Sequence, residues 1–526
     1  MLLALWASAA AAAPVAPLVN ISSGQLRGKF SSDGKAASFL DVPFATAERF
    51  TPPKPPPSWS GIRDAQEYGP GCMQHHPGSN PDVPVNQTED CTRLNVFAPV
   101  DAFTPGAVKK YPVMVWWHGG AYKEGSSFGP FDLYDGRNLS SAYGVIVVTC
   151  NYRLDVFGAL VHDGGIDGNF GFLDQRACLE WVRDEIGHFG GDATSVTAWG
   201  QSAGAQSVFL HMASPGSKGL FHRAILESAP DLSLFDAKEA ARMGRAFAKE
   251  LGCKNRTDAE TIACMKAASA ADVVHAADKT QSNFFSIVET LSLKHPTSSF
   301  LPFKPNIDGT VLPENPLQAL LEGRAPAAVP ALIGFNHDEM WALLDSLPSW
   351  VKNLEVQAAL AILFGLGTAT RAWEHYKGLG DDLSIVSKVL TDYMFTCSSQ
   401  ALAAALPDPT FVYQFNHLDS FGPSLFGKFN LAQCEHRACH MAEIPFIFGN
   451  TGPASFNVSF TPAEEALRAR LMGAFTNFAK AGDAGWVAFN ASARGGLRIN
   501  QTAVEGPLGA AGQVCPEVWD KTGYYH

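Results

Sequence analysis

The sequence is poor in charged residues and, after its first residues, lacks long hydrophobic runs. Only 17% of its 526 residues are charged, and 51 acidic residues outnumber 39 basic ones, which gives a net charge of −12. Proteins that bind nucleic acid or anionic membranes use clustered basic side chains, so this balance argues against both kinds of partner. A bilayer span needs about 20 consecutive apolar residues, and no later segment approaches that length. We therefore expect no stable membrane anchor.

Metal-binding spacings are also missing. The sequence contains no CxxC and no HExxH pattern, which are spacings at which zinc proteins place their ligands. We expect neither a metal site nor an organic cofactor. Neither composition nor any motif predicts an oligomeric state.

The first residues are typical of an exported protein. "MLLALWASAAAAAPVAP" is an apolar run followed by small residues, which predicts a signal peptide over residues 1–13. A buried N-terminal strand or helix is the alternative interpretation. Ten cysteines and seven N-x-S/T sequons also favour a secreted, extracellular protein, with one domain over residues 14–526. The candidate glycosylation sites are Asn20, Asn86, Asn138, Asn255, Asn457, Asn490 and Asn500.

From residue 111 the chain alternates between strand-like and helix-like segments. "YPVMVWWH" from residue 111 and "GVIVVTCNY" from residue 144 are continuous apolar runs, typical of strands covered on both faces. "LDQRACLEWVRDEIGHFGG" predicts a helix that ends at its glycines. Further strands are expected at 195–200, 223–228, 330–336 and 410–416, helices within 230–330, and a helix from the N-cap Thr461 to Gly482. The pattern predicts an α/β fold.

A candidate nucleophile lies where the strand at 195–200 meets a helix. In "TAWGQSAGAQS", residues 197–207, Ser202 stands at the centre of a Gly-x-Ser-x-Gly pattern. A strand before such a serine and a helix after it are the context of a nucleophile elbow. The alternative is an ordinary polar residue in a turn.

Oxyanion donors would come from two backbone segments. "WWHGGAY" places Gly119, Gly120 and Ala121 directly after a strand, and such small residues allow a substrate carbonyl to approach the backbone. The N–H group of Ala203, the residue after the candidate nucleophile, is a further donor.

The acid and the base follow later in the chain. Asp338 and Glu339 come directly after the strand at 330–336, at the sheet edge where α/β proteins keep their sites. His440, in "RACHMAEIPFIFGN", is the favoured base. The order serine, acid, histidine is that of an α/β-hydrolase. The competing histidines are His75, His76, His118 and His337.

With these residues in place, the chain resembles the type-B carboxylesterases, the family that includes the cholinesterases. The resemblance begins near Gly24 and rests on linked motifs in the family's order: "FLDVPFATAERFTPP", "EDCTRLNVFAP", "NYRLDVFGAL", "GNFGFLDQRACLEWVRDEIGHFGGD" and "VTAWGQSAG". It implies an α/β-hydrolase fold, with a large, mixed, mostly parallel central sheet flanked by helices and with helical insertions over the active site.

The resemblance also implies residue roles. Ser202 matches the nucleophile, Glu339 the acid and His440 the base. Met340 replaces the family's glycine after the acid, which leaves Asp338 as an alternative. The oxyanion donors would be Gly120, Ala121 and Ala203, with Gly119 beside them. Gln201 stands where the family often has glutamate, and Ser228 matches a serine close to the histidine.

The same resemblance implies scaffold pairs. It gives disulfides Cys72–Cys91, Cys253–Cys264 and Cys397–Cys515, and ion pairs Arg49–Glu89 and Arg153–Asp174. We further expect a fourth disulfide between Cys434 and Cys439, next to His440, and buried free thiols at Cys150 and Cys178.

The expected activity is hydrolysis of a small-molecule carboxylic ester by a secreted serine esterase, through an acyl-enzyme. Cholinesterases hold a quaternary ammonium group with aromatic rings, but "MQHHPGSNPDVPVNQTED", between Cys72 and Cys91, contains no Trp, Tyr or Phe. A cholinesterase-like or lipase-like esterase remains the alternative, followed by a non-catalytic binding protein of the same family.

Overall fold

A computed structural model describes residues 16–75, 83–230, 232–254, 256–282, 303–344, 355–452, 458–500, 503–508 and 514–524. The expected signal peptide at 1–13 lies outside these residues, as do His76 and the sequons at Asn255 and Asn457.

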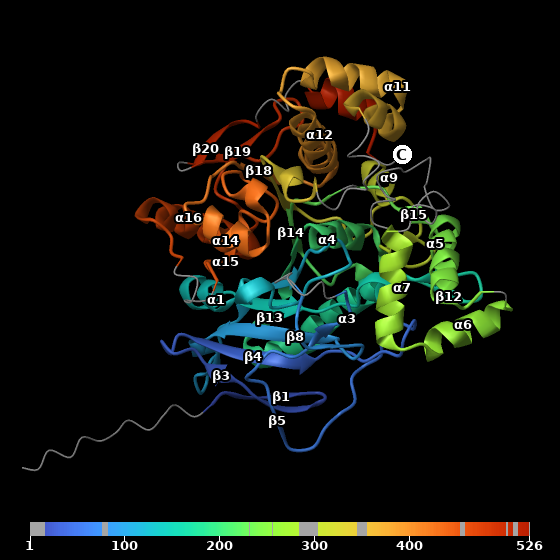
Figure 1. The fold of residues 1–526 in the computed structure, drawn as a ribbon. Helices are drawn as coiled ribbons and strands as arrows, with labels where there is room; N and C mark the ends of the chain where they lie inside the picture. The colour runs from blue at the N-terminus through green and yellow to red at the C-terminus, as the bar shows by residue number, and fades with distance from the viewer. Residues whose placement is uncertain are drawn as a thin grey trace, which may run out of the picture.

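An eleven-stranded mixed sheet runs through the molecule, from blue β3 and β4 to red β19 and β20 in Figure 1. In spatial order the strands are β20 (Ala503–Pro507), β19 (Gly495–Ile499), β18 (Phe411–Phe415), β17 (Ala331–Asn336), β14 (Arg223–Glu227), β13 (Gly191–Gln201), β9 (Tyr111–Trp117), β10 (Ile146–Cys150), β8 (Arg93–Pro99), β4 (Ala36–Pro43) and β3 (Lys29–Phe30). All neighbours from β19 to β10 pair in parallel, and the outer pairs are antiparallel.

The central strands are buried on both faces, which explains their continuous apolar sequences. In β9, Val113, Val115 and Trp117 point into one core, whereas Met114 and Trp116 point into the other. This alternation is the two-residue period of a strand, applied to a sheet with two covered faces.

Helices on each side supply the rest of the two cores. Residues of α3 (Phe170–Glu185) and α4 (Ala203–Ala213) enter the first core. Residues of α1 (Arg137–Tyr143), α15 (Ile444–Phe448) and α16 (Pro462–Ala481) enter the second. The indole rings of Trp116 and Trp199, on adjacent strands, meet there with centroids 4.6 Å apart. The α/β-hydrolase architecture expected from the sequence is confirmed.

The helix expected after Thr461 is α16. Thr461 Oγ1 accepts the N–H of Glu464, the Glu464 carboxylate accepts the N–H of Thr461, and the helix ends at Gly482 with φ 73°. This is the reciprocal capping box that the sequence predicts.

Most of the helices expected within 230–330 form a third core with their neighbours. The helices of this core are α5 (Ala237–Glu250), α6 (Asp258–Ala267) and α7 (Ala270–Ser282), whereas α9 (Pro316–Leu321) enters the first core through Leu317 and Leu320. Three more helices are α11 (Val356–Tyr376), α12 (Asp382–Thr391) and α13 (Ser398–Ala405), of which α11 and α12 lie at the top of Figure 1. The shorter elements are β1 (Leu18–Ile21), β2 (Gly24–Arg27), β5 (Ile62–Asp64), β6 (Gly71–Cys72), β7 (Gln87–Thr88), β11 (Val161–His162), β12 (Ile166–Asp167), β15 (Phe235–Asp236), β16 (Asn306–Ile307), α2 (Asp155–Ala159), α14 (Gly422–Lys428) and α18 (Asp520–Thr522).

The cysteines lie at bonding distance in five pairs. Four are the expected ones: Cys72–Cys91, Cys253–Cys264, Cys397–Cys515 and Cys434–Cys439. The fifth joins Cys150 of β10 to Cys178 of α3, so the expectation of two free thiols there is wrong in this structure. The packing of α3 on the sheet brings the two Cα atoms to 6.7 Å, a proximity that the sequence did not reveal.

Candidate active site

Ser202 occupies a sharp turn between β13 and α4. Its backbone has φ 55° and ψ −124°, a strained conformation for a residue with a side chain. Its N–H group donates to the carbonyl of Glu227 at 2.8 Å. The flanking glycines are required by space: a Cβ at Gly204 would lie 2.0 Å from the Trp117 carbonyl oxygen, and one at Gly200 would lie 2.5 Å from the backbone of Gly204. The Gly-x-Ser-x-Gly pattern is therefore a packing requirement of this turn.

Glu339 and His440 form a buried pair. Glu339 follows β17, and its Oε2 atom lies 2.5 Å from Nδ1 of His440. Its other oxygen accepts the N–H of Asn336 at 2.6 Å, which fixes the carboxylate. Glu339 is fully buried and His440 is 5% exposed, so water does not compete for this contact.

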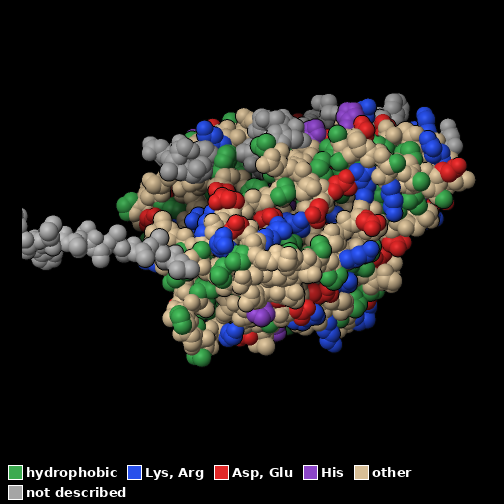
Figure 2. All heavy atoms as spheres, turned by 90° about the horizontal axis from the view of Figure 1, so that it is seen from below, with side chains coloured by type: hydrophobic (Ala, Val, Ile, Leu, Met, Phe, Trp, Pro, Cys, Tyr) green, Lys and Arg blue, Asp and Glu red, His purple; other side chains and the backbone are tan. Residues whose placement is uncertain are grey.

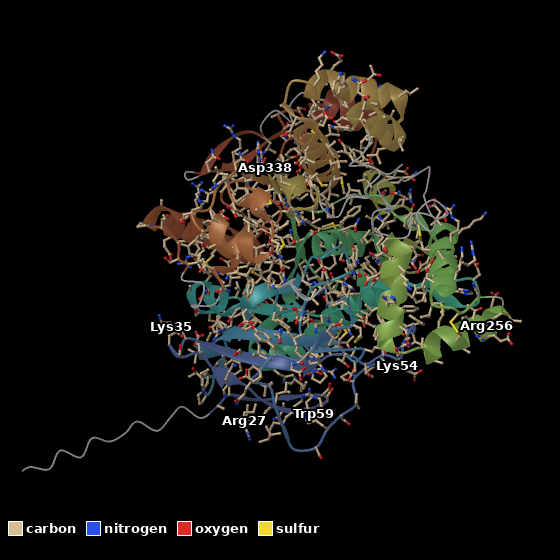
Figure 3. All side chains as sticks on the ribbon, in the orientation of Figure 1. Arg27, Lys35, Lys54, Trp59, Arg256 and Asp338 are labelled. Atoms are coloured by element: carbon tan, nitrogen blue, oxygen red, sulfur yellow. A yellow bond between two sulfur atoms is a disulfide. The ribbon has the colours of Figure 1, made fainter. Side chains whose placement is uncertain are left out.

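The neighbouring acid faces elsewhere. Asp338 Oδ1 lies 3.0 Å from Nδ1 of His337, and its Oδ2 accepts the N–H of Ala438 at 3.3 Å. Figure 3 labels Asp338 in the upper part of the molecule, between the helices at the left and those at the top of the view. The structure thus brings Glu339, and not Asp338, to His440.

The other ring nitrogen of His440 faces Gln201. The Gln201 side-chain amide lies 3.0 Å from His440 Nε2. An amide nitrogen can only donate, so Nε2 accepts and Nδ1 carries the proton toward Glu339. This is the tautomer in which Nε2 can take a proton from a serine. Among the described residues, no hydrogen bond joins the Ser202 hydroxyl to His440.

The competing histidines that are described have other partners. His118 is buried and stacks on Tyr152, and its Nδ1–H donates to the Gly119 carbonyl at 2.7 Å. Burial lowers the pKa of His118 to about 4. His337 contacts Asp338, and His75 contacts Asp278.

The loop at residues 119–125, hereafter the 119–125 loop, lies against Ser202. A Cβ built on Gly119 would lie 2.8 Å from the Cβ of Ser202 and 2.6 Å from Oε1 of Gln201. Gly120, Ala121 and Tyr122 all have positive φ values, 100°, 58° and 59°. Three such residues in succession describe a tight, strained turn directly beside the serine.

Two buried carboxyl groups behind Glu339 were not predicted from the sequence. Asn336 Nδ2 donates to Glu443, and Trp199 Nε1 donates to Glu227. Burial and the nearby Glu339 raise the pKa of Glu443 to about 7, and burial raises the pKa of Glu227 well above its ordinary value. Ser228, the residue after Glu227, is fully buried with φ 52°. The position of Glu443, three residues after His440, was the one signal that could have revealed it.

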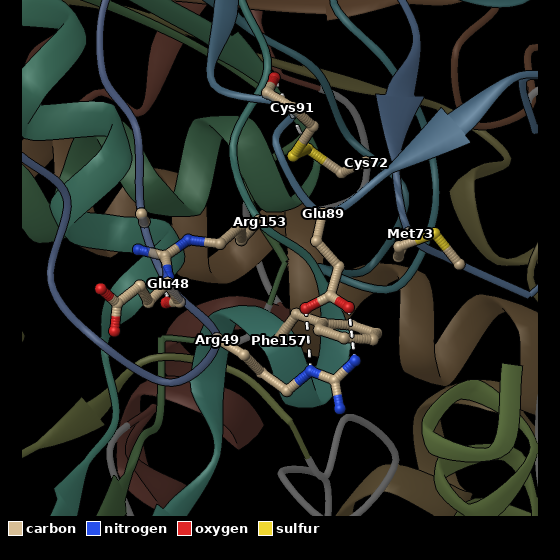
Figure 4. Close-up of a pocket in the computed structure, with 9 residues that line it drawn as sticks. Glu48, Arg49, Cys72, Met73, Glu89, Cys91, Arg153 and Phe157 are labelled. Atoms are coloured by element: carbon tan, nitrogen blue, oxygen red, sulfur yellow. Dashed lines mark hydrogen bonds and ion pairs between the residues drawn. A yellow bond between two sulfur atoms is a disulfide. The ribbon is translucent and has the colours of Figure 1, made fainter. Parts of the chain in front are cut away.

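A small cavity lies apart from Ser202, beside the Cys72–Cys91 pair (Figure 4). Arg49 Nε donates to the Glu89 carboxylate at 2.8 Å along one side of it. Nearby, Arg153 Nη2 lies 2.8 Å from Asp174 Oδ1. The two ion pairs expected from the resemblance therefore form, and both brace the scaffold.

Clustered metal-ligand residues and long apolar helices are both missing from the described part of the chain. It contains no group of three or more His, Cys, Asp or Glu side chains placed to hold a metal ion, and none of its helices is long and apolar enough to cross a membrane. On the face seen in Figure 2, acidic and basic side chains are interspersed.

Comparisons with known proteins agree with one another. Residues 15–505 match the carboxylesterase family. Para-nitrobenzyl esterase of Bacillus subtilis is 32% identical over 487 residues, covering 90% of this chain and 91% of that protein. Liver carboxylesterase 1 of Oryctolagus cuniculus is 32% identical over 507 residues, covering 89% and 86%. The solved structure of a PNB esterase superposes with a TM-score of 0.76 and 31% identity, covering 95% of this chain and 99% of that one.

Proposed function

The chain belongs to the carboxylesterase family and is a carboxylic ester hydrolase, and on that premise we propose that it acts through Ser202, His440 and Glu339 with a covalent acyl-enzyme. The observation that carries the proposal is the 2.5 Å contact between Glu339 and His440, in a buried site that also contains Ser202.

Acylation begins when His440 Nε2 takes the hydroxyl proton of Ser202. The Ser202 oxygen attacks the ester carbonyl carbon, and the carbonyl oxygen becomes negatively charged. The N–H groups of Gly120, Ala121 and Ala203 stabilise this oxyanion, with Gly119 beside them. The bond to the alcohol oxygen then breaks, and the leaving alcohol takes the proton from His440.

Deacylation repeats these steps with water. His440 removes a proton from water, the hydroxide oxygen attacks the acyl carbon, and the acid leaves as Ser202 recovers its proton. Glu339 holds the imidazole in the required tautomer and stabilises the imidazolium that forms twice in each cycle. Gln201 and Ser228 complete the surroundings of His440 without taking part in a bond change.

The substrate is a small-molecule ester without a required cationic group. The absence of aromatic residues in the sequence between Cys72 and Cys91 supports this assignment over a choline ester. A filled serine, acid and histidine set favours an enzyme over a non-catalytic relative.

Export is part of the proposal. Residues 1–13 would be removed as a signal peptide, leaving one secreted domain over 14–526. The disulfide-distance pairs are compatible with an oxidising compartment. Four sequons have exposed asparagines suited to glycans: Asn20, Asn86, Asn490 and Asn500. Asn138 is unsuited, because its side-chain nitrogen donates to Gly449 O at 3.0 Å and to Asn450 Oδ1 at 2.8 Å.

The test compares the secreted wild type with Ser202→Ala on p-nitrophenyl esters from acetate to palmitate, and on a thiocholine ester. We expect Ser202→Ala to lower kcat by roughly 10⁶-fold, as in other serine hydrolases. A residual rate within about tenfold of wild type would contradict the assignment, since nucleophile loss costs several orders of magnitude. Preference for the thiocholine ester would instead favour the cholinesterase alternative.

A further inference from the structure

Asp155 is an unusual residue at the start of α2. It is 5% exposed and has φ 50°, in the left-handed region that side chains rarely adopt. Strained, buried residues of this kind persist only where surrounding contacts hold them, and they gather at functional sites. None of the steps proposed above uses Asp155.

The backbone of Asp155 holds the 119–125 loop. Its N–H group donates to the carbonyl of Tyr122 at 2.6 Å. Tyr122 directly follows Ala121, whose N–H is a proposed oxyanion donor. Gln74 also exchanges two hydrogen bonds with Gly125 of the loop, at 2.8 and 2.9 Å, and Ser207 donates to the Tyr122 hydroxyl at 3.2 Å. The Asp155 contact is made at the residue after Ala121, and the contact of His118 Nδ1 with the Gly119 carbonyl is made at the residue before Gly120.

The side chain of Asp155 belongs to a charged cluster. Both of its oxygens lie 3.2 Å from Gln281 Nε2 of α7. Lys123, from the 119–125 loop, pairs with Asp278 Oδ1 of α7 at 3.1 Å, and His75 contacts the other oxygen of Asp278. Lys123 and Asp278 are the charged groups that act on the Asp155 carboxyl, with opposite signs.

We propose that Asp155 is a positioning residue for the 119–125 loop. Its ionised carboxylate attracts the ammonium group of Lys123, and this attraction holds the loop in its catalytic geometry. Lys123 lies two residues after Ala121, so a pull on Lys123 acts on the backbone that carries the oxyanion donors. A carboxylate also accepts the Gln281 amide more strongly than a neutral carboxyl group does. The inference rests on the proposed function, in which N–H groups of this loop stabilise the oxyanion.

The charge on Asp155 changes in the neutral range. Burial is the largest cause and raises the pKa of Asp155 from its ordinary 3.8 to about 7, while Lys123 lowers it and Asp278 raises it. The loop is therefore held most firmly above pH 7 and loosens as Asp155 takes up a proton below it.

The test is the ratio of kcat for wild type to kcat for Asp155→Asn on p-nitrophenyl acetate, from pH 5.5 to 8.5. Asparagine keeps the size and the tolerance of positive φ but has no charge. The ionisation of His440 is common to both proteins and divides out of the ratio. We expect a ratio near one at pH 5.5, rising roughly three- to tenfold by pH 8.5 as misplaced donors slow the reaction. KM should differ by less than about twofold, since the donors act on the transition state.

Two further variants make the measurement specific. In a Lys123→Gln background the Asp155 carboxylate has no ammonium group of the loop to attract, so the same ratio should lose most of its rise with pH. Asp41→Asn is the matched control, because Asp41 is another aspartate with positive φ, but its carboxylate pairs with Arg63 away from this loop. Its ratio should stay flat. A ratio for Asp155→Asn that does not change with pH would overturn the proposal, whereas a wild type without Ser202-dependent activity would overturn the proposed function instead.

Stability gives a readout that does not need activity. Since folding raises the pKa of Asp155, the folded state binds the extra proton, and the stability gained from it is lost as pH rises from about 4 to 7. Asp155→Asn avoids this loss, so its melting temperature relative to wild type should be higher at pH 8.5 than at pH 5.5. An equal difference at both pH values would contradict the ionisation of Asp155 on which the proposal depends.

Discussion

Glu339 and Asp338 are neighbours in the sequence, yet their carboxylates contact different histidines. Glu339 meets the buried His440, whereas Asp338 meets the half-exposed His337. The short helical turn after β17 separates the two side chains, and burial then makes only one of them a strong partner. The resemblance favoured Glu339 on position alone, and the geometry supplies a physical reason for that choice.

We predict that Glu339→Gln lowers kcat by about 10³- to 10⁴-fold, because an amide cannot fix the tautomer or stabilise the imidazolium. Steady-state kinetics on p-nitrophenyl acetate checks this. Asp338→Asn is the matched control and should keep kcat within about twofold, in line with surface substitutions. If Asp338→Asn proved the more damaging change, the assignment of the acid would be wrong.

Some site residues could be predicted from the sequence and others could not. The difference is whether neighbours in the sequence or distant parts of the fold constrain them. Ser202 was recognisable because its turn demands glycines two residues on either side. Glu227, Glu443 and Asp155 carry no such mark, since each is a single acid in an ordinary stretch of sequence. Their properties arise from burial and from partners on other elements of the chain, which no local pattern records.

The turn between β13 and α4 depends on close backbone contact. Gly204, in the first turn of α4, lies against the end of β9, and a methyl group there would lie 2.0 Å from the Trp117 carbonyl oxygen. Backbone cannot yield as a flexible side chain can, so either the helix or the strand must shift.

We predict that Gly204→Ala lowers the free energy of unfolding by about 3 kcal/mol, the cost of overpacking a tight core, and removes most esterase activity. Thermal unfolding and steady-state rates check both effects. Gly187→Ala is the control, because a Cβ at Gly187 meets no atom within 4 Å. Equal melting temperatures for the two variants would contradict this prediction, because they would mean that the turn accommodates a methyl group at residue 204.

Elements with strong periodic or apolar signals were predicted well. The strands at 111, 144 and 330, the helix at 173 and the capped α16 all occur, and the family resemblance is confirmed. The order of strands in the sheet and the pairing of Cys150 with Cys178 were not predicted, because both depend on how distant elements pack.

Across the whole molecule, one cross-link spans far more chain than the others. Cys397 and Cys515 enclose 118 residues, including β18, β19, α16 and His440. Cys434 and Cys439 have a sequence separation of only 5. A longer closed loop restricts the unfolded chain more, so the two bridges should stabilise the fold unequally.

We predict that replacing Cys397 and Cys515 by serine costs about 5 kcal/mol, whereas replacing Cys434 and Cys439 costs about 2 kcal/mol, by the entropy of loop closure. Denaturant unfolding of the two double variants, at equal protein concentration, checks the order. A larger loss for the Cys434 and Cys439 variant would mean that the short bridge stabilises the native loop itself.

The contact between Trp116 and Trp199 has an optical consequence. Two indole rings held 4.6 Å apart at a fixed angle couple their electronic transitions, and that coupling produces circular dichroism in the near ultraviolet only while the packing is intact. Trp199 lies on β13, three residues before Ser202. The near-ultraviolet circular dichroism of the native protein therefore reports on the packing of the strand that directly precedes Ser202.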